Sequence, residues 1–456
     1  MIFLKHQLAI NEPKPYTIRW FPPLSHTFFF RCLSFVTAML VFQSPFAQIL
    51  TIEQAIERAL KNNYDILLAK NEAEIASRNN SVGNAGMLPR INGTLSDNFT
   101  LNNLNQKFSN GNEINTTGVT GNNLSAGVAL NWTLFDGLRM FAIKSRLNKL
   151  EEIGLLQLKD EMQTVVANVM NAYYDAVRAQ QQLHAIEEAI KISEERVKLA
   201  EARFQVGTSG KTDLLQAKVD LNEQKSNLLL QKKIIAQRKA DLNTLLSQAA
   251  ETDFAVTDSI PFLLKNVSAD LEQKNLQILV ANKNIDVAKQ LKREAFSQYF
   301  PTLIGNVGYN YNRSNNSAGF FLVNQTNGLN AGFTLSVPLF NGLNTIRQNK
   351  VAAIQIQSAQ FNADKVRFQT KLSQYKALSD FAMAQEQLIL EQENILLADE
   401  NQKIAMERFK LAQSTAIELR EAQWSYINAQ TRLVNARYAA KVAETELMRL
   451  QGELVR

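Results

Sequence analysis

The stretch ALNWTLFDGLR, from Ala129 to Arg139, joins the two patterns that decide the fold. Its first part alternates apolar and polar residues, which is typical of a strand, and a helical pattern begins where it ends. The stretch TLSVPLFNGLN, from Thr334 to Asn344, has the same arrangement 205 residues later and the same Leu-Phe-Asp/Asn-Gly-Leu motif. A strand that leads into a helix, twice in one chain, predicts a duplicated unit.

The correspondence extends well beyond this motif. At the same offset of 205, RFQVGTSGKTDLLQA (Arg203–Ala217) falls on RFKLAQSTAIELREA (Arg408–Ala422) without a gap. Upstream the offset becomes 212, as for Asn63 and Asn275. The change of offset falls in an Asn/Gly/Ser-rich region, where a loop tip would tolerate extra residues.

These correspondences predict two repeats and a connector. The first repeat covers residues 48–249, with a β-hairpin at 89–135, and the second covers 269–456, with a β-hairpin at 301–340. Residues 250–268 would form an equatorial connector at mid-height. In each repeat we expect a helix before the hairpin, then a long helix and a shorter one.

The N-terminal residues predict export, and the composition limits the chemistry. Arg31 precedes the apolar run Cys32–Phe42, and cleavage is expected after Ala47, so residues 1–47 are interpreted as a signal peptide with an extended n-region. The mature chain then has no cysteine and one histidine, so we expect no enzyme activity, metal site or cofactor. The formal charge of +6 forms no basic patch, so no nucleic-acid partner is expected.

The strand patterns each have one apolar and one polar face. Before Phe135, the even-numbered positions from Leu124 to Leu134 are apolar or small, and the odd-numbered positions are small or polar. Strands of about 10 residues with this pattern suit a membrane barrel, apolar outside and wet inside. A soluble sandwich would need more strands and two apolar inner faces. Four strands cannot close a barrel, so closure requires several chains.

The helical segments predict a long antiparallel coiled coil. From Leu158 to Phe204, apolar and small residues recur at alternating spacings of four and three, which is a heptad seam. A helix from about Gly137 to Val206 would be ~105 Å long. Pairs of short helices, stacked end to end, would run beside it. The short helices are expected at Ile52–Gly86, Thr212–Gln248, Ala269–Phe300 and Ile417–Leu450.

Together these features resemble the TolC family of outer-membrane efflux and secretion ducts. The resemblance is carried by LFDGL and LFNGL, by Pro89 and Pro301 before the hairpins, by RFQVGTSGKTDLLQAKVDL, and by NARY at Asn435–Tyr438. It spans about Thr51 to Gly452. It implies a homotrimer, with a 12-stranded barrel in the outer-membrane lipid of a Gram-negative bacterium and a 12-helix barrel in the periplasm. It also implies an exit duct that a periplasmic adaptor connects to an inner-membrane pump.

The resemblance assigns adaptor contact to the two distal turns. Val206, Gly207 and Thr208 match the family's turn that meets the adaptor, whereas Ala412 replaces the glycine at the second turn. Gly207 also has a purely structural explanation, because glycine commonly ends a helix in the left-handed conformation.

The resemblance also assigns a periplasmic gate. Glu418 and Glu421 fall on positions that form a cation-attracting ring, although acidic residues also occur in ordinary solvated first turns of helices. Thr212 and Asp213 match residues that hold the duct closed. Two expected partners are replaced, because Phe409 and Ser414 stand where the family has Tyr and Arg.

Three aromatic residues are candidates for a girdle at the membrane surface. Trp132, Tyr309 and Tyr311 lie in the strand patterns, and amphipathic rings favour the membrane interface. Packing against a neighbouring chain would explain them equally well. The competing function is a periplasmic coiled-coil scaffold or adaptor without a pore, which would explain the heptads but not the strands.

Overall fold

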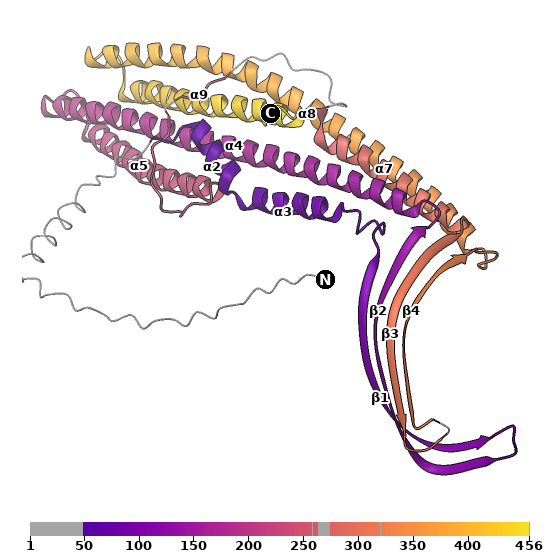
Figure 1. Cartoon of the computed structure of the whole chain (residues 1–456). Coiled ribbons are helices and arrows are strands. Elements are labelled where there is room, and N and C mark those ends of the chain that lie inside the picture. Colours follow the sequence, from indigo (N-terminus) through magenta and orange to yellow (C-terminus); the bar gives the residue numbers. More distant parts are fainter. Residues whose placement is uncertain (1–48, 258, 263–273, 320, 456) are drawn as a thin grey trace, which may run out of the picture. The chain divides into compact units, whose positions relative to one another are not determined.

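The computed structural model describes residues 49–257, 259–262, 274–319 and 321–455 (Figure 1). The predicted signal peptide and part of the predicted connector lie outside the described residues. Helices and strands occur in the expected order, twice. The helices are α2 (Ile52–Asn62), α3 (Tyr64–Asn79), α4 (Arg139–Gln205), α5 (Lys211–Leu245), α7 (Leu276–Phe296), η1 (Ser297–Tyr299), α8 (Asn344–Lys410) and α9 (Ala416–Leu450), and the strands are β1 (Arg90–Lys107), β2 (Glu113–Phe135), β3 (Thr302–Asn316) and β4 (Val323–Ser336).

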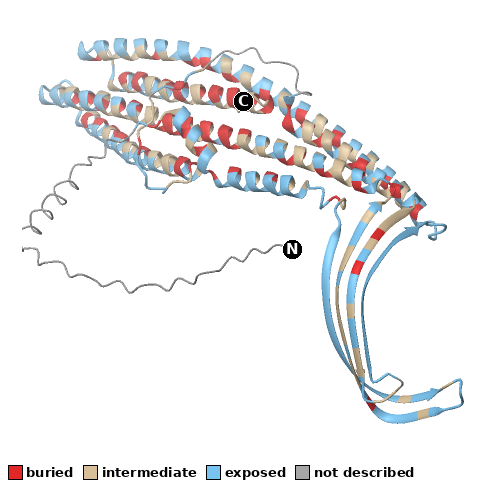
Figure 2. Cartoon of the chain, viewed as in Figure 1, coloured by how far each residue is buried: buried red, intermediate tan, exposed pale blue. Residues whose placement is uncertain are grey.

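The four strands form one antiparallel sheet in the order β1-β2-β3-β4. Leu130 of β2 pairs with Ile91 on one side and with Val307 on the other, and Val307 pairs with Ala331. Paired residues share a face, so the apolar positions of all four strands form one continuous surface. The two outer strands, β1 and β4, are almost entirely exposed, whereas β2 and β3 are partly buried (Figure 2). The predicted alternation of an apolar and a polar face is confirmed.

The apolar surface ends at charged residues. On β3 it runs from Leu303 to Tyr311 and is followed by Arg313, which pairs across the sheet with Leu124. On the other side of Leu124 lies Asp97. The apolar part of the strand thus has about the 9–11 residues that cross a bilayer.

The Leu-Phe-Asp/Asn-Gly-Leu motif forms the same turn at both strand-to-helix junctions. Gly137 and Leu138 have φ of 71° and 68°, and Gly342 and Leu343 have φ of 65° and 62°. The Asp136 carboxylate accepts hydrogen bonds of 3.0 and 3.2 Å from the Met140 N–H. Each leucine is in a left-handed conformation that costs about 1–2 kcal/mol, which the surrounding packing must offset.

The two long helices, α4 and α8, have 67 residues each and are therefore about 100 Å long. α4 packs against α3, α5, α7 and α9, and α7 also packs against α8. Among the described helices, none has both the length and the apolarity needed to cross a bilayer. Six positions of the predicted seam of α4 are buried, namely Val165, Val169, Ala176, Ala179, Ser193 and Ala200. The other seam positions are half-buried, except Phe204, which is exposed.

The expectation of a single helix from Ile52 to Gly86 is wrong. The helix breaks at Asn63, whose side chain accepts hydrogen bonds from the Asp65 and Ile66 N–H groups and so begins α3. The Asn63 amide also donates to the carbonyl of Leu245, the last residue of α5, at 2.9 Å. The hydrogen bond at this break therefore connects the start of α3 to the end of α5.

The second half of the chain has the corresponding contact. Asn275 accepts a hydrogen bond from the Ile278 N–H at the start of α7, and its amide donates to the carbonyl of Leu450 at the end of α9, at 3.0 Å. Other boundaries also differ from expectation, because α3 ends at Asn79 and α7 at Phe296. β4 ends at Ser336, because Pro338 has no N–H to donate to a neighbouring strand.

Candidate functional site

The first distal turn connects α4 to α5. The Thr208 N–H donates to the Arg203 carbonyl at 2.9 Å, the Gly207 N–H donates to the Phe204 carbonyl at 3.1 Å, and Gly207 has φ of 76°. A Cβ atom on Gly207 would meet no other atom within 4 Å. Glycine is therefore favoured here by the backbone conformation and not by crowding. Val206 is 72% exposed and available to a partner.

The second distal turn connects α8 to α9 and has the same backbone geometry. The Gln413 N–H donates to the Arg408 carbonyl at 2.8 Å, and the Ala412 N–H donates to the Phe409 carbonyl at 3.0 Å. Ala412 has φ of 59°, so an alanine adopts the left-handed conformation that a glycine has in the first turn. The two turns thus differ in strain but not in their backbone hydrogen bonds.

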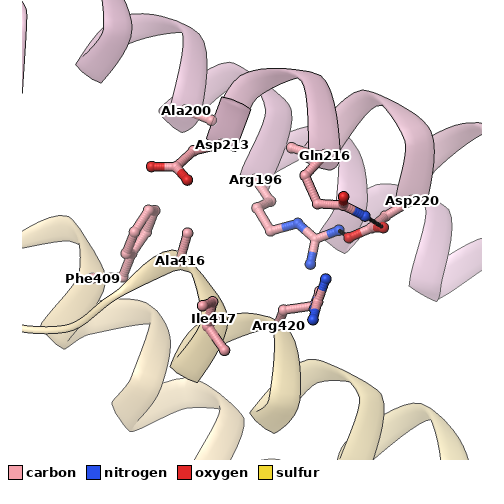
Figure 3. Close-up of a pocket in the computed structure, with 10 residues that line it drawn as sticks. Arg196, Ala200, Asp213, Gln216, Asp220, Phe409, Ala416, Ile417 and Arg420 are labelled. Atoms are coloured by element: carbon pink, nitrogen blue, oxygen red, sulfur yellow. Dashed lines mark hydrogen bonds and ion pairs between the residues drawn. The ribbon is translucent and has the colours of Figure 1, made fainter. Parts of the chain in front are cut away.

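A groove lies above the first turn, between α4 and α5. We define the first groove by Arg196, Asp213, Gln216 and Asp220. α4 and α5 form the first helical hairpin, and α8 and α9 form the second. Residues of the second helical hairpin cover the groove, with Phe409 near Asp213 and Arg420 near Arg196 (Figure 3). The first groove is therefore a contact between the two helical hairpins of one chain.

A buried ion pair holds this contact together. Arg196 on α4 donates to the Asp220 carboxylate on α5 at 2.6 Å (Figure 3). It also donates to the Gln423 side-chain carbonyl on α9 at 3.2 Å. Only 6% of the Arg196 side chain and 9% of the Asp220 side chain are exposed. Burial lowers the pKa of Arg196, which the nearby Asp220 carboxylate partly counteracts. Arg196 therefore connects three helices and depends on Asp220 for compensation of its charge.

Phe409 supports the same contact. It is 3% exposed, and the Arg203 guanidinium lies over its ring, 4.5 Å from the centroid. The nearby Ser414 hydroxyl is buried and has no hydrogen-bond partner in the described part of the chain. Phe409, where the resemblance implies a Tyr, thus makes a cation–π contact to a residue of α4.

The matching groove, between α8 and α9, contains Glu418 and Glu421. Both are exposed, and the Thr415 hydroxyl caps α9 by accepting a hydrogen bond from the Glu418 N–H at 3.2 Å. Within the described ranges, no group of three or more His, Cys, Asp or Glu residues could hold a metal ion. We define the second groove by Asn401, Glu418, Glu421 and Ser425, which correspond at the offset of 205 to Arg196, Asp213, Gln216 and Asp220.

The structure separates the four predicted gate residues into two places. Asp213 lies on the wall of the first groove and accepts a hydrogen bond from the Ser209 hydroxyl at 2.6 Å. Thr212 is exposed in the first turn of α5, whereas Glu418 and Glu421 lie in the second groove of the same chain. Their roles in gating stay predictions.

The three predicted girdle residues share the apolar face but not one height. Trp132 pairs with Gly305, six residues along β3 from Tyr311, which corresponds to about 20 Å. The Trp132 indole donates to the Met87 carbonyl at 3.0 Å, near the helical end of the sheet. Tyr309 and Tyr311 lie towards Arg313 at the other end. Their role at the membrane surface stays a prediction.

Sequence reasoning missed Arg196 and Asp220. A signal was present, because Leu214, Ala217 and Asp220 follow one another at the three-residue spacing of a buried helical face. A carboxylate at such a position requires a buried cation, and Arg196 is one residue before the seam position Val197.

Comparison with known proteins connects this arrangement to a family. The outer membrane efflux protein family matches residues 55–248 and 267–453, which is most of the chain. The chain belongs to this family. The protein is therefore located in the outer membrane. The family match covers both long helices and both β-hairpins.

Individual relatives of the chain are distant. Outer membrane protein TolC of Vibrio cholerae is 25% identical over 237 residues, covering 50% of this chain and 54% of TolC. Protein CyaE of Bordetella pertussis is 24% identical over 273 residues, covering 58% of this chain and 56% of CyaE. The matches thus span about half the length of these relatives. The outer membrane channel CmeC of Campylobacter jejuni shares the fold, with a TM-score of 0.74 over 88% of this chain and 85% of CmeC, at 18% identity.

Proposed function

We propose that three copies of this chain form an exit duct in the outer membrane. The duct would passively conduct substrates that an inner-membrane pump delivers through a periplasmic adaptor. The observation that carries this proposal is the sheet, because its apolar face is continuous across four strands and its strands lead directly into α4 and α8. Leu95 and Phe333 are 76% and 78% exposed in the single chain, and surrounding lipid would cover them.

The unpaired edges of the sheet support a trimer. Within the described residues, β1 and β4 each pair with one strand, and an open edge is not tolerated in lipid. Two chains would give eight strands, a barrel whose interior side chains fill. Three chains would give 12 strands and leave a lumen, so a conducting duct favours three.

The polar face of the sheet suits the wall of an aqueous lumen. Asn92 pairs with Ala129, Ala129 with Gly308, and Gly308 with Asn330. From Asn92 to Thr100 on β1, and at the positions paired with these residues, this face has no charged side chain. We expect the barrel to discriminate little between cations and anions, so charge selection would occur at the distal end.

The two grooves suggest how the chains meet at the distal end. In one chain, Phe409 and Ile417 cover the first groove. The residues at the offset of 205, Phe204 and Thr212, are exposed. We expect these residues of the neighbouring chain to cover the second groove in the same way. Glu418 and Glu421 of three chains would then surround the opening and attract cations.

The chain has the properties expected of a duplicated unit. Asn63 and Asn275 make corresponding bonds to the ends of α5 and α9, and both strand-to-helix junctions have two consecutive left-handed residues. Three chains with two repeats each would surround the axis with six similar units. This arrangement would align both distal turns of every chain with the adaptor.

Conductance of the purified protein tests the proposed duct. Insertion into a planar lipid bilayer should give discrete channels. Substitutions that weaken the contacts near the distal turns should increase the conductance of these channels. Absence of channels from a protein that stays in solution without detergent would favour the alternative, a periplasmic coiled-coil scaffold. The exposed apolar face of the sheet argues against that alternative.

A further inference from the structure

A cavity separate from the two grooves lies at the other end of the helices, where they meet the sheet. It has a volume of about 690 Å³ and is formed by the first turns of α4 and the last turns of α7, with Ile356 of α8 at its side. This volume is in the range of small-molecule sites. All three helices belong to one chain, so assembly of several chains is not needed to form the cavity.

One wall of this cavity is apolar and exposed. Leu138 and Phe141 come from α4 and the turn before it, and they are 60% and 59% exposed. Phe296 ends α7 and Phe300 directly follows η1. Their ring centroids are 5.7 Å apart, and they are 53% and 42% exposed. Four large apolar side chains in contact with water are unfavourable, so an apolar occupant would stabilise this wall.

The rim of the same cavity is basic. Lys289, Lys292 and Arg293 lie on the last two turns of α7. Lys289 is paired with Asp286 at 3.1 Å, whereas Arg293 donates to the uncharged Gln290 side chain at 3.3 Å. In the described part of the chain, no carboxylate forms an ion pair with Lys292 or Arg293. The rim therefore has two cationic groups that an anionic ligand could neutralise.

The position of the cavity identifies the kind of ligand. Phe300 is two residues before β3, and Leu138 is three residues after β2, so the apolar wall continues the apolar face of the sheet. Lys292 and Arg293 lie further from the sheet along α7, where headgroups would follow the hydrocarbon region. We propose that this cavity binds an anionic phospholipid of the periplasmic leaflet, with acyl chains against the phenylalanines and the phosphate at Lys292 and Arg293.

A polar cavity on another side of α7 supports this orientation. It is lined by amide side chains, including Gln277, Asn284 and Gln369. Around the helix, Asn284 is about 180° from Arg293 and about 80° from Lys292. Amides suit the aqueous interior of a duct, so the basic and apolar cavity would face outwards. The proposal rests on the outer-membrane barrel of the proposed function.

The other junction of the chain offers an internal comparison. At the offset of 212, Lys289, Lys292 and Arg293 correspond to Ser77, Asn80 and Ser81. The basic rim is therefore absent where α3 leads to β1. We expect one lipid site per chain and three per trimer, not six.

Native mass spectrometry of the trimer, extracted in mild detergent, tests the lipid site. The protein would be mixed with equal amounts of phosphatidylglycerol and phosphatidylethanolamine of the same acyl composition. The wild-type trimer should retain up to three phosphatidylglycerol molecules in preference to phosphatidylethanolamine. The double variant Lys292→Gln/Arg293→Gln should lose about fivefold of this preference for each basic residue removed.

Two further variants separate the charge from the apolar wall. Lys232→Gln/Lys233→Gln, an exposed basic pair on α5, should leave the preference unchanged. Phe141→Ser should weaken retention of both lipids without changing their ratio. Equal retention of the two lipids by an intact wild-type trimer would overturn the lipid site and leave the duct standing. Absence of a trimer in the same spectrum would instead overturn the proposed function.

Discussion

The two distal grooves have matching positions but different chemistry. The first groove contains the Arg196–Asp220 pair and is covered by the other hairpin of the same chain. The second groove has Asn401 and Ser425 at the matching positions, together with Glu418 and Glu421. The first is thus a charge-balanced contact within the chain, and the second is an acidic surface for solvent, ions or a neighbouring chain. The same backbone supports a fixed contact in one place and an open one in the other.

Arg196→Met should have the largest effect on this difference. It leaves the Asp220 carboxylate buried without its cation, which costs about 3–5 kcal/mol. Amide hydrogen exchange in the first turns of α9, which contact Arg196 through Gln423, should become much faster. Asn401→Met, the matching change in the second groove, should have little effect.

A second variant verifies the cause. In Arg196→Met/Asp220→Leu both charges are removed, so most of the lost protection should return. Exchange in α9 that is equally slow in wild type and Arg196→Met would show that the pair does not hold the two hairpins together.

Gly207→Val should have the next largest effect. A β-branched residue at a φ of 76° is strained by about 2 kcal/mol, and its side chain extends into the space expected for the adaptor. Export should fall while the amount of protein in the outer membrane stays the same, measured with a compound that the host fails to export when this gene is deleted. Ala412→Val tests the same strain at the second turn. Unchanged export of that compound in Gly207→Val would remove the first turn from adaptor binding.

Glu418→Gln/Glu421→Gln should have a moderate effect, limited to the second groove. The concentration of a divalent cation that blocks half of the conductance should rise about tenfold, which corresponds to about 1.4 kcal/mol. Asp213→Asn changes a carboxylate of the first groove and should leave the block by the divalent cation unchanged. A similar shift in both variants would contradict the distinction between the grooves.

Ala412→Gly should have the smallest effect. It relieves the left-handed alanine but adds freedom to the unfolded chain, so the second turn should gain about 0.5 kcal/mol. Gly207→Ala should destabilise the first turn by about 1 kcal/mol. Hydrogen exchange at Gln413 and Thr208, whose N–H groups close the two turns, measures both changes. Opposite signs are required if strain is what distinguishes the turns.

The sheet could be predicted from the sequence because its information is local. Alternation in each strand fixes which side chains share a face, and the register then aligns Ile91, Leu130 and Val307 on the apolar face. The length of α4 could also be predicted, because its heptad seam is uninterrupted. The helix-rich fold with four antiparallel strands is confirmed.

The remaining features depend on contacts between distant residues. The helix break at Asn63 is stabilised by the end of α5, 182 residues away, and nothing in the local sequence shows that contact. The Arg196–Gln423 bond likewise joins helices from different halves of the chain. The backbone of the second turn was also hidden, because Ala412 gives no sign of the left-handed conformation that a glycine would.

The native mass of the mature chain, extracted from outer membranes in mild detergent, tests the central claim most directly. A mass of three chains is predicted, because 12 strands would pair the edges of β1 and β4 around a barrel with an open lumen. A monomer or dimer whose mass is the same without detergent would contradict the shared barrel and favour the scaffold.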